Sequence, residues 1–178
     1  MSDDPASLNG AWIHEAVAHY EGPLTLYATR LTGNLERARD VVQETFLKLC
    51  RQRREEVDEH LAEWLYTVCR NHALDTRRKE RRMTAIATST LSERCDSTPS
   101  PEIAFERGEE TGAVLRLLDD LPEEQQECIR LKFQHGRSYK EISAITCKSV
   151  SHVGVLIHLG VKALRTQVEA RSTGVSPV

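Results

Sequence analysis

Apolar residues recur every three or four positions through most of this 178-residue chain, and no stretch alternates apolar and polar residues as a strand would. Such spacing places apolar side chains along one side of a helix. Aromatic residues make up only 5% of the sequence, so the cores must consist mainly of Leu, Ile, Val and Ala. The sequence therefore predicts an all-α fold built from small helical domains.

One segment interrupts the helical pattern. Residues 83–102, MTAIATSTLSERCDSTPSPE, are rich in Ser and Thr, contain two prolines and show no sustained periodicity. This composition is typical of a linker. We therefore expect a first domain over 8–82, a flexible linker over 83–112, a second domain over 113–170 and a disordered tail over 171–178.

Turn and cap residues divide the first domain into helices. Asn9 is predicted to cap the first helix, and the Gly-Pro pair at 22–23 to end it and start the next. Asn34 is predicted to cap a helix over 35–51. A polar loop, RQRREEVDEH at 51–60, should follow.

The third long helix of the first domain begins near residue 61 and ends in a basic run. Its apolar side is predicted to carry Leu61, Leu65, Val68 and His72. From Arg70 to Arg82 there are six basic residues against Asp75 and Glu80. The whole chain has a net charge of -3, so this basic stripe within a mildly acidic protein favours a local phosphate-binding face.

The second domain has the pattern of a helix-turn-helix. After a helix over 113–121, Pro122 opens a helix that should stop at Gly136. Ser138 and Glu141 form a capping box for a short helix, and Ser149 caps the last one. The apolar stripe of the last helix is predicted to be Val150, Val153, Ile157, Gly160 and Leu164. A short helix, a turn of about three residues and a longer helix is the helix-turn-helix arrangement.

Cysteine usage and hydropathy exclude several classes of protein. The five cysteines are widely spaced and form no C-x-x-C pair, so we expect reduced, mostly buried thiols rather than disulfides or a zinc site. No apolar run approaches the length of a membrane span, and the first ten residues lack the order of a signal peptide. The sequence therefore predicts a cytoplasmic protein without membrane insertion.

Three blocks, in their order and spacing, resemble a known family. They are GNLERARDVVQETFLKL, then EWLYTVCRNHALDTRRKERR, and then a block running from LDDLPEEQQECIRLKF through SYKEISAITCKSVSHVGVLIH to KALR. The chain resembles bacterial sigma-70 family RNA polymerase sigma factors of the extracytoplasmic-function (ECF, RpoE-like) class over nearly its whole length. The resemblance implies two helical domains, sigma-2 and sigma-4, joined by a flexible linker. It also implies a transcription initiation factor that guides core RNA polymerase to promoters.

The first block is implied to bind the polymerase. In the family this surface grips the clamp coiled coil of the largest subunit, while sigma-4 meets the flap. The matching positions of this chain are Asp40, Gln43, Glu44 and Leu47. An ordinary solvated helix face would show the same mixture of polar and apolar residues, so this assignment depends on the other two blocks.

The second block is implied to meet the -10 element, where a non-template base is flipped into a protein pocket. The matching positions are Trp64, Arg70, Asn71, Arg77, Arg78, Lys79, Arg81 and Arg82. The preceding loop at 53–60 is implied to meet the -10 element together with this helix. The amide of Asn71 can pair with a base edge, and the basic end of the helix can lie along phosphates. Favourable charge at a helix C-terminus would also explain the basic run. Simple core packing would explain Trp64 and His72.

The third block is implied to read the -35 element from the last helix. The positions suited to bases and phosphates are Lys148, Ser149, Ser151, His152, Val155, His158, Lys162 and Arg165. Relatives usually carry basic residues near four positions that are Gly154, Leu156, Leu159 and Val161 here.

The apolar residues of this last helix have two interpretations. Val155 and Leu159 can meet thymine methyl groups in the major groove. Alternatively, Val155, Leu156 and Leu159 can form a patch for a protein partner. We expect both in alternation: the helix reads DNA when the protein is free and is covered by a partner when it is idle.

The resemblance also implies partners and excludes others. The expected partners are core RNA polymerase, promoter DNA and an anti-sigma protein that holds the factor inactive until release. The chain is expected to be a monomer when free, with no cofactor, metal or catalytic residue.

Two alternatives compete with this interpretation. A helix-turn-helix regulator acting without polymerase docking would normally be a symmetric dimer, and no dimerisation helix is left over for that. An enzyme using Asp40, Glu44, His72 and Asp75 would lack every common catalytic motif: the sequence has no H-E-x-x-H, phosphate loop or nucleophile elbow.

Overall fold

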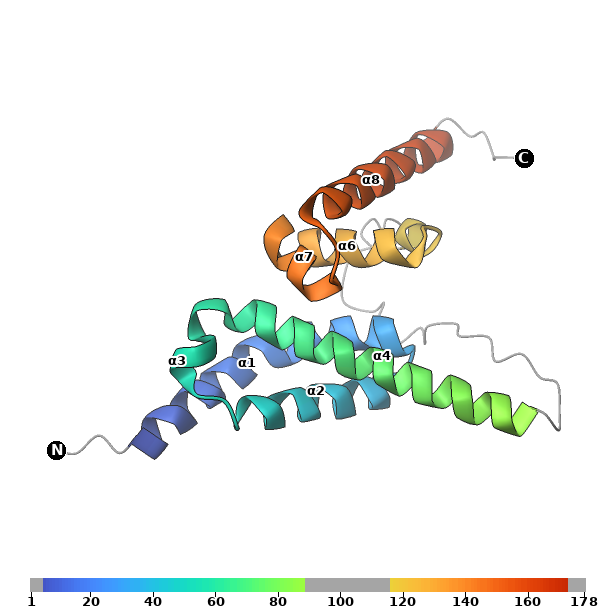
Figure 1. Cartoon of the computed structure of the whole chain (residues 1–178). Coiled ribbons are helices and arrows are strands. Elements are labelled where there is room, and N and C mark those ends of the chain that lie inside the picture. The colour runs from blue at the N-terminus through green and yellow to red at the C-terminus, as the bar shows by residue number, and fades with distance from the viewer. Residues whose placement is uncertain (1–4, 89–115, 173–178) are drawn as a thin grey trace. The chain divides into compact units, whose positions relative to one another are not determined.

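The computed structural model describes residues 5–88 and 116–172, and these residues form helices and turns without a strand (Figure 1). The chain divides into two compact units, Met1–Ser100 and Pro101–Val178. The predicted all-α, two-domain fold is therefore confirmed. Most of the predicted linker and the end of the predicted tail lie outside the described residues.

The first helix is longer than the sequence suggested. α1 spans Pro5–Thr32 without a break, so the predicted cap at Asn9 and the predicted end at residues 22–23 are wrong. Pro23 has no N–H to donate to the carbonyl four residues earlier. Because residues 21–23 are exposed, water can satisfy that carbonyl, while buried side chains hold the helix on both sides of the proline. These buried side chains are Trp12, Ala16, Leu24, Tyr27 and Ala28.

The second helix agrees with its prediction. α2 spans Leu35–Leu49, and the side chain of its cap Asn34 accepts a hydrogen bond from the Arg37 N–H at 3.0 Å. Its buried face consists of Ala38, Val41, Val42, Thr45, Phe46 and Leu49.

The predicted polar loop is partly helical. Residues Arg54–Val57 form α3 and Asp58–His60 a 3₁₀ turn, η1. Val57 is buried, and the indole N–H of Trp12 in α1 donates to Asp58 Oδ1 at 3.0 Å. The hydrogen bond from Trp12 therefore ties this connection to α1, and the buried Val57 side chain adds an apolar contact within the unit.

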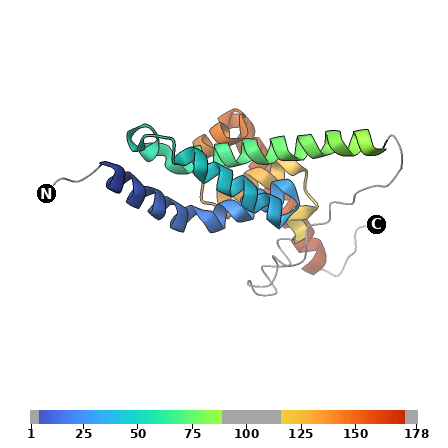
Figure 2. The same cartoon turned by 90° about the horizontal axis from the view of Figure 1, so that it is seen from below.

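The third long helix packs against both α1 and α2. α4 spans Leu61–Thr88, beginning as predicted but continuing six residues into the predicted linker. Its core side carries Leu65, Tyr66, Cys69 and Ala73. Of the predicted apolar side only Leu65 is fully buried, because Leu61, Val68 and His72 are half-buried. Figure 2 shows α1, α2 and α4 side by side as one layered bundle.

The thiols differ in exposure. Among the described cysteines, all free, Cys69 and Cys128 are buried while Cys50 and Cys147 are exposed. Burial raises the pKa of the Cys69 thiol to about 12, although a hydrogen bond with Thr45 acts in the opposite direction. Cys69 is therefore an inert core residue.

The described part of the second unit starts with helical residues 116–119, which are followed by α6, Glu123–Phe133. Gly136 ends this helix as predicted: its φ of 67° is the left-handed conformation that glycine adopts without steric cost. The Arg137 N–H then donates to the Leu131 carbonyl at 2.8 Å. Arg130 is buried and pairs with Asp119 at 2.8 Å.

Two capped helices complete the second unit. α7 spans Tyr139–Thr146 and begins with the predicted capping box, in which the Ser138 N–H donates to Glu141 Oε2 at 2.8 Å. α8 spans Val150–Ser172, and the Ser149 hydroxyl accepts from the His152 N–H at 3.2 Å. The core side of α8 consists of Val153, Leu156, Ile157 and Gly160. Val150, predicted to be in the core, is 47% exposed.

Taken alone, none of the described helices is long and apolar enough to cross a membrane. Only α7 and α8 together meet those requirements of length and composition, and they are bent by 103° at their junction.

Gly160 sets how closely α8 approaches α6. A Cβ at this position would overlap Ile129 Cδ1 and would lie 3.4 Å from the Cβ of Gln125 and from Leu121 Cδ1. Gly154, on the same helix, has room: a Cβ there would meet only Tyr139 Cε2, at 3.8 Å. Alanine substitutions at these two glycines of one helix can therefore be compared directly, since only one of them crowds α6.

We predict that Gly160→Ala leaves the second unit about 1–3 kcal/mol less stable than Gly154→Ala does, because the added methyl group at residue 160 overpacks the contact with α6. Gly154→Ala should instead stabilise it by up to about 1 kcal/mol through helix propensity. Urea denaturation of the full chain, followed by far-UV circular dichroism, measures both. Equal stability of the two variants would contradict this account of the α6–α8 contact.

His135 makes the second unit sensitive to acid. Its side chain is buried at the end of α6, and burial, with the nearby charges of Arg137 and Arg130, lowers its pKa from 6.5 to about 4. The unfolded chain therefore binds a proton at a higher pH than the folded unit does. Stability from this group is present above pH 6.5 and is lost as the pH falls towards 4.

We predict that His135→Gln reduces the loss of stability of the second unit between pH 7 and pH 5 by about 2 kcal/mol. Both tryptophans lie in the first unit, so their fluorescence reports its unfolding separately from the circular dichroism of the whole chain. The substitution should change the pH dependence of the circular dichroism transition and leave the fluorescence transition unchanged. An unchanged pH dependence of both would contradict the assignment.

Candidate protein and nucleic-acid interfaces

The outer face of α2 presents a mixed strip of side chains. Asp40, Gln43, Glu44 and Leu47, here called the α2 strip, are all exposed and follow the i, i+3, i+4, i+7 spacing of one helix side. Leu47 is 46% exposed, although it is a large apolar residue. Carboxylates and an amide around an exposed leucine suit a protein surface that offers cations next to an apolar contact.

Polar contacts join α2 to α4 beside this strip. Arg37 Nε lies 2.6 Å from Glu80 Oε1, and since both side chains are partly exposed the pair contributes at most about 1 kcal/mol. His72 of α4 is half-buried, and burial, then the charge of Lys48, lowers its pKa against the opposing influence of Glu44. His72 therefore packs as a neutral side chain between the two helices.

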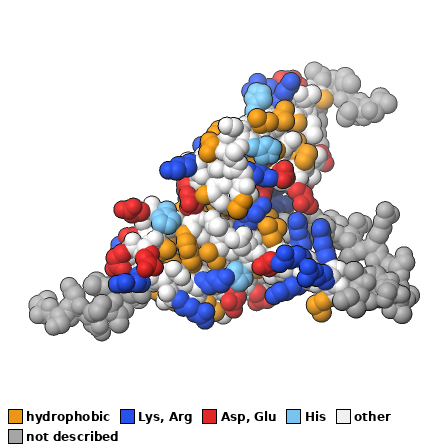
Figure 3. All heavy atoms as spheres, in the orientation of Figure 1, with side chains coloured by type: hydrophobic (Ala, Val, Ile, Leu, Met, Phe, Trp, Pro, Cys, Tyr) orange, Lys and Arg blue, Asp and Glu red, His pale blue; other side chains and the backbone are white. Residues whose placement is uncertain are grey.

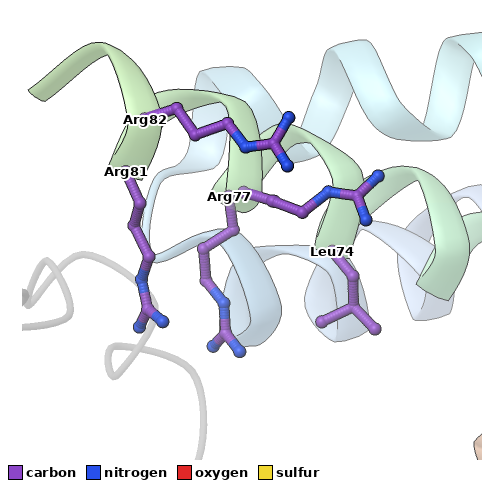
Figure 4. A pocket seen from close by; sticks show the side chains of 5 residues that line it. Leu74, Arg77, Arg81 and Arg82 are labelled. Atoms are coloured by element: carbon purple, nitrogen blue, oxygen red, sulfur yellow. The ribbon is translucent and has the colours of Figure 1, made fainter. Parts of the chain in front are cut away.

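The C-terminal half of α4 carries a cluster of cations. Leu74, Arg77, Arg78, Arg81 and Arg82 line a hollow of about 410 Å³ (Figure 4). Arg70 and Asn71 lie one helical turn before Leu74 on the same side, by the same i, i+3, i+4 spacing. We call these seven residues the arginine face.

The sequence missed one member of the arginine face and included a residue that lies elsewhere. Leu74 was not predicted because it is apolar, although it stands four residues after Arg70 and three before Arg77. Lys79 does not line the hollow, and its charge acts on His72, beside α2. The structure therefore does not bring Lys79 together with the other predicted -10 residues.

The acids within the basic run are engaged by arginines. Asp75 pairs with Arg78 at 2.9 Å, and Glu80 is taken by Arg37 of α2. Asp75 offsets one of the five arginines of the arginine face, so the face keeps an excess of positive charge, which suits a run of phosphates. Trp64 is half-buried seven residues before Asn71, where it supports the same side of the helix.

The turn of the helix-turn-helix is held by one serine. Cys147 adopts a left-handed conformation with φ 56°, which is uncommon for a residue other than glycine. The Ser143 carbonyl accepts from the Lys148 N–H at 3.2 Å, and its hydroxyl donates to the Lys148 carbonyl. These bonds fix the angle between α7 and α8.

Lys148 was predicted to contact DNA, but in the structure its side chain contacts another helix of the same unit. Its ammonium group pairs with Glu124 of α6, and its side chain is only 16% exposed. In this conformation the lysine ties the turn to α6 within the unit. This ion pair could not be predicted from the sequence, because the two residues are 24 positions apart.

The outer face of α8 brings the remaining -35 candidates together. Ser151, Val155, His158, Lys162 and Arg165 follow one helix side, flanked by His152 and Leu159, and all seven are exposed; Ser149 is exposed at the cap. Val155 is 52% and Leu159 47% exposed. Leu156, predicted to join their apolar patch, is buried at 7% exposure, so the predicted patch is corrected to two residues. Leu156 lies on the core side with Val153, three residues earlier.

Comparison with known proteins places both units in one family. The chain matches the family models for sigma-70 region 2 over residues 16–83 and for sigma-70 region 4 over residues 111–164.

Three curated relatives agree with these matches. The ECF RNA polymerase sigma factor EcfG of Rhodopseudomonas palustris is 34% identical over 123 residues, covering 68% of this chain and 66% of the relative. SigE of Mycolicibacterium smegmatis is 28% identical, and the match covers 89% of this chain and 62% of SigE. For SigL of Mycobacterium tuberculosis the identity is 27%, and the match covers 92% of this chain and 93% of SigL. The chain thus spans just under two thirds of the length of EcfG and SigE.

A solved structure shares the fold. The sigma factor RpoE of Bartonella quintana, crystallised with the anti-sigma factor NepR, superposes with a TM-score of 0.66 at 20% identity, covering 88% of this chain and 96% of that one. Together with the two matched regions, these likenesses show that the chain belongs to the sigma-70 family, among the ECF RNA polymerase sigma factors.

Proposed function

We propose that this chain is a transcription initiation factor that binds core RNA polymerase and directs it to specific promoters. One observation carries the proposal. The α2 strip and the arginine face lie on two packed helices of one unit, so one surface suited to protein is fixed beside one suited to nucleic acid. A body of this kind can hold an enzyme over a DNA site without performing catalysis itself.

The α2 strip is the proposed polymerase surface. Asp40 and Glu44 offer carboxylates to basic residues, Gln43 offers an amide, and Leu47 supplies an exposed apolar contact. In this proposal they bind the clamp coiled coil of the largest subunit, while the second unit contacts the flap.

The arginine face is the proposed -10 surface. Its cations hold the phosphates, and Asn71, exposed on the same side, pairs with the edge of an unstacked base. Unstacking a base costs a few kcal/mol, which contacts to the flipped base offset. The polymerase supplies the catalysis, and the factor acts in the cytoplasm with it.

Control by an inhibitor is part of the proposal. The Bartonella quintana RpoE structure contains an anti-sigma factor, and the present chain shares its fold. We propose that a protein of that kind holds this chain inactive, as a monomer, until release. The second candidate, a helix-turn-helix regulator acting alone, uses only α7 and α8 and leaves the α2 strip without a function.

We predict that Asp40→Ala/Gln43→Ala loses binding to bacterial core polymerase, and that Asn71→Ala binds core normally but opens promoters poorly. Run-off transcription on genomic fragments, with permanganate footprinting of unpaired thymines, separates the two defects. A double variant of two exposed α1 residues, His14→Ala/Glu15→Ala, is the control and should behave as wild type. Normal core binding by the Asp40/Gln43 variant would contradict the docking assignment.

We also predict that Arg77→Ala/Arg81→Ala weakens binding of the holoenzyme to promoter DNA and lowers the slope of log K against log salt by about one to two, since each lost phosphate contact removes about 0.7–0.9. Lys79→Ala is the matched control, because Lys79 lies away from the hollow. Its slope should stay close to that of wild type. If Lys79→Ala changed the salt slope as much as Arg77→Ala or Arg81→Ala did alone, net charge, and not the arginine face, would account for phosphate binding.

A further inference from the structure

Two aliphatic side chains on α8 are exposed without a role in the core of the second unit. Val155 and Leu159 are about half exposed, one helical turn apart, on the side opposite the buried Val153 and Gly160. Two aliphatic side chains exposed side by side on one helix face form a small apolar patch, which suits contact with an external surface.

Charge favours DNA over a protein as that surface. From Ile142 to Val168 the chain contains no Asp or Glu, whereas Lys162 and Arg165 are exposed on the same helix side as Val155. Figure 3 shows hydrophobic, histidine and basic side chains together over α8. An apolar centre with cations at its end matches the edge of a groove bordered by phosphates.

Gly154 is a second, independent indication. It is partly exposed in the interior of α8, where glycine costs about 1 kcal/mol relative to alanine. The unit itself does not require it, since a methyl group there would meet only Tyr139 Cε2, at an ordinary contact distance of 3.8 Å. A bare backbone at a partly exposed position next to Val155 lets an external partner approach this side of the helix closely.

The spacing of the two side chains fits base pairs that are two steps apart. Side chains four residues apart on a helix lie about 6 Å apart, close to two base-pair steps of about 3.4 Å. In the major groove the C5 methyl group of thymine is the apolar feature that distinguishes one base from the others. Ser151 and His152, one turn earlier, can contact the polar edges beside it.

We infer that α8 reads thymine methyl groups through Val155 and Leu159, so that the upstream element of this factor's promoters carries thymines at the contacted positions. This inference rests on the proposed function and specifies the DNA that the second unit takes. Gly154 allows the helix to sit deep enough for the methyl groups to be reached.

The test replaces thymine by deoxyuridine, which keeps the hydrogen-bonding pattern and lacks the methyl group. Promoters found by run-off transcription are resynthesised with one substitution at a time in the upstream element, and holoenzyme affinity is measured. We expect about fourfold weaker binding at each of two positions, the value of one buried methyl group. Val155→Ala should abolish the difference at one position and Leu159→Ala at the other.

Two further variants control the measurement. Val168→Ala removes an exposed aliphatic residue on a different side of α8 and should keep both effects. Gly154→Ala should weaken promoter binding although it stabilises the unit, which separates a role in binding from a role in folding.

The outcomes distinguish the inference from the proposed function. Initiation by wild type without any effect of deoxyuridine would overturn the inference and leave the function intact. Loss of binding to a co-purifying inhibitor by Val155→Ala and Leu159→Ala, with unchanged promoter binding, would show that the two residues form a protein surface and would also overturn it. If wild type neither binds core polymerase nor initiates on unmodified DNA, both proposals fail.

Discussion

Close packing of α2 against α4 determines what the first unit can do. Both helices bury small residues completely: Ala38 and Thr45 on α2, Cys69 and Ala73 on α4. Small side chains let the two helices approach, and Thr45 hydrogen-bonds the Cys69 thiol across the contact. Since both helices are fixed to each other, the outer face of one and the basic end of the other keep a constant geometry. A factor that bridges polymerase and DNA needs that rigidity.

In the second unit, hydrogen bonds and an ion pair near the turn hold the short helices in place. Hydrogen bonds from Ser143 hold α7 at its angle to α8, and the capping box at Ser138 stabilises the start of α7. The ion pair between Lys148 and Glu124 attaches the turn to α6. Acidic residues gather at the start of α6, and none occurs between Glu141 of α7 and Glu169 near the end of α8. Charge separation of this kind makes one side of the unit suitable for an anionic partner.

Features set by neighbouring residues were predictable from sequence. Asn34, Ser138 and Ser149 cap their helices because each needs only a backbone N–H two or three residues away, and Gly136 ends α6 for a similarly local reason. The proline at residue 23 misled the prediction, because exposure of its surroundings removed the cost of the lost hydrogen bond.

Features set by distant residues were not predictable. The connection after α2 is ordered by a bond from Trp12 to Asp58, 46 positions later, and Lys148 is withdrawn by a partner on another helix. Leu156 was assigned to the outside because the core stripe was drawn from Val150, which is exposed. Family resemblance supplied the roles of the candidate residues, and the geometry showed that Leu74 belongs with them while Lys79 does not.

The central claim is that one unit touches polymerase with α2 and DNA with α4 at the same time. A photo-crosslinking amino acid placed at Leu47 or at Arg81, in holoenzyme bound to promoter DNA, tests it most directly. The account predicts a crosslink from position 47 to the largest polymerase subunit and one from position 81 to DNA near the start site. Crosslinks from both positions to DNA, or from position 47 to no polymerase subunit, would contradict it.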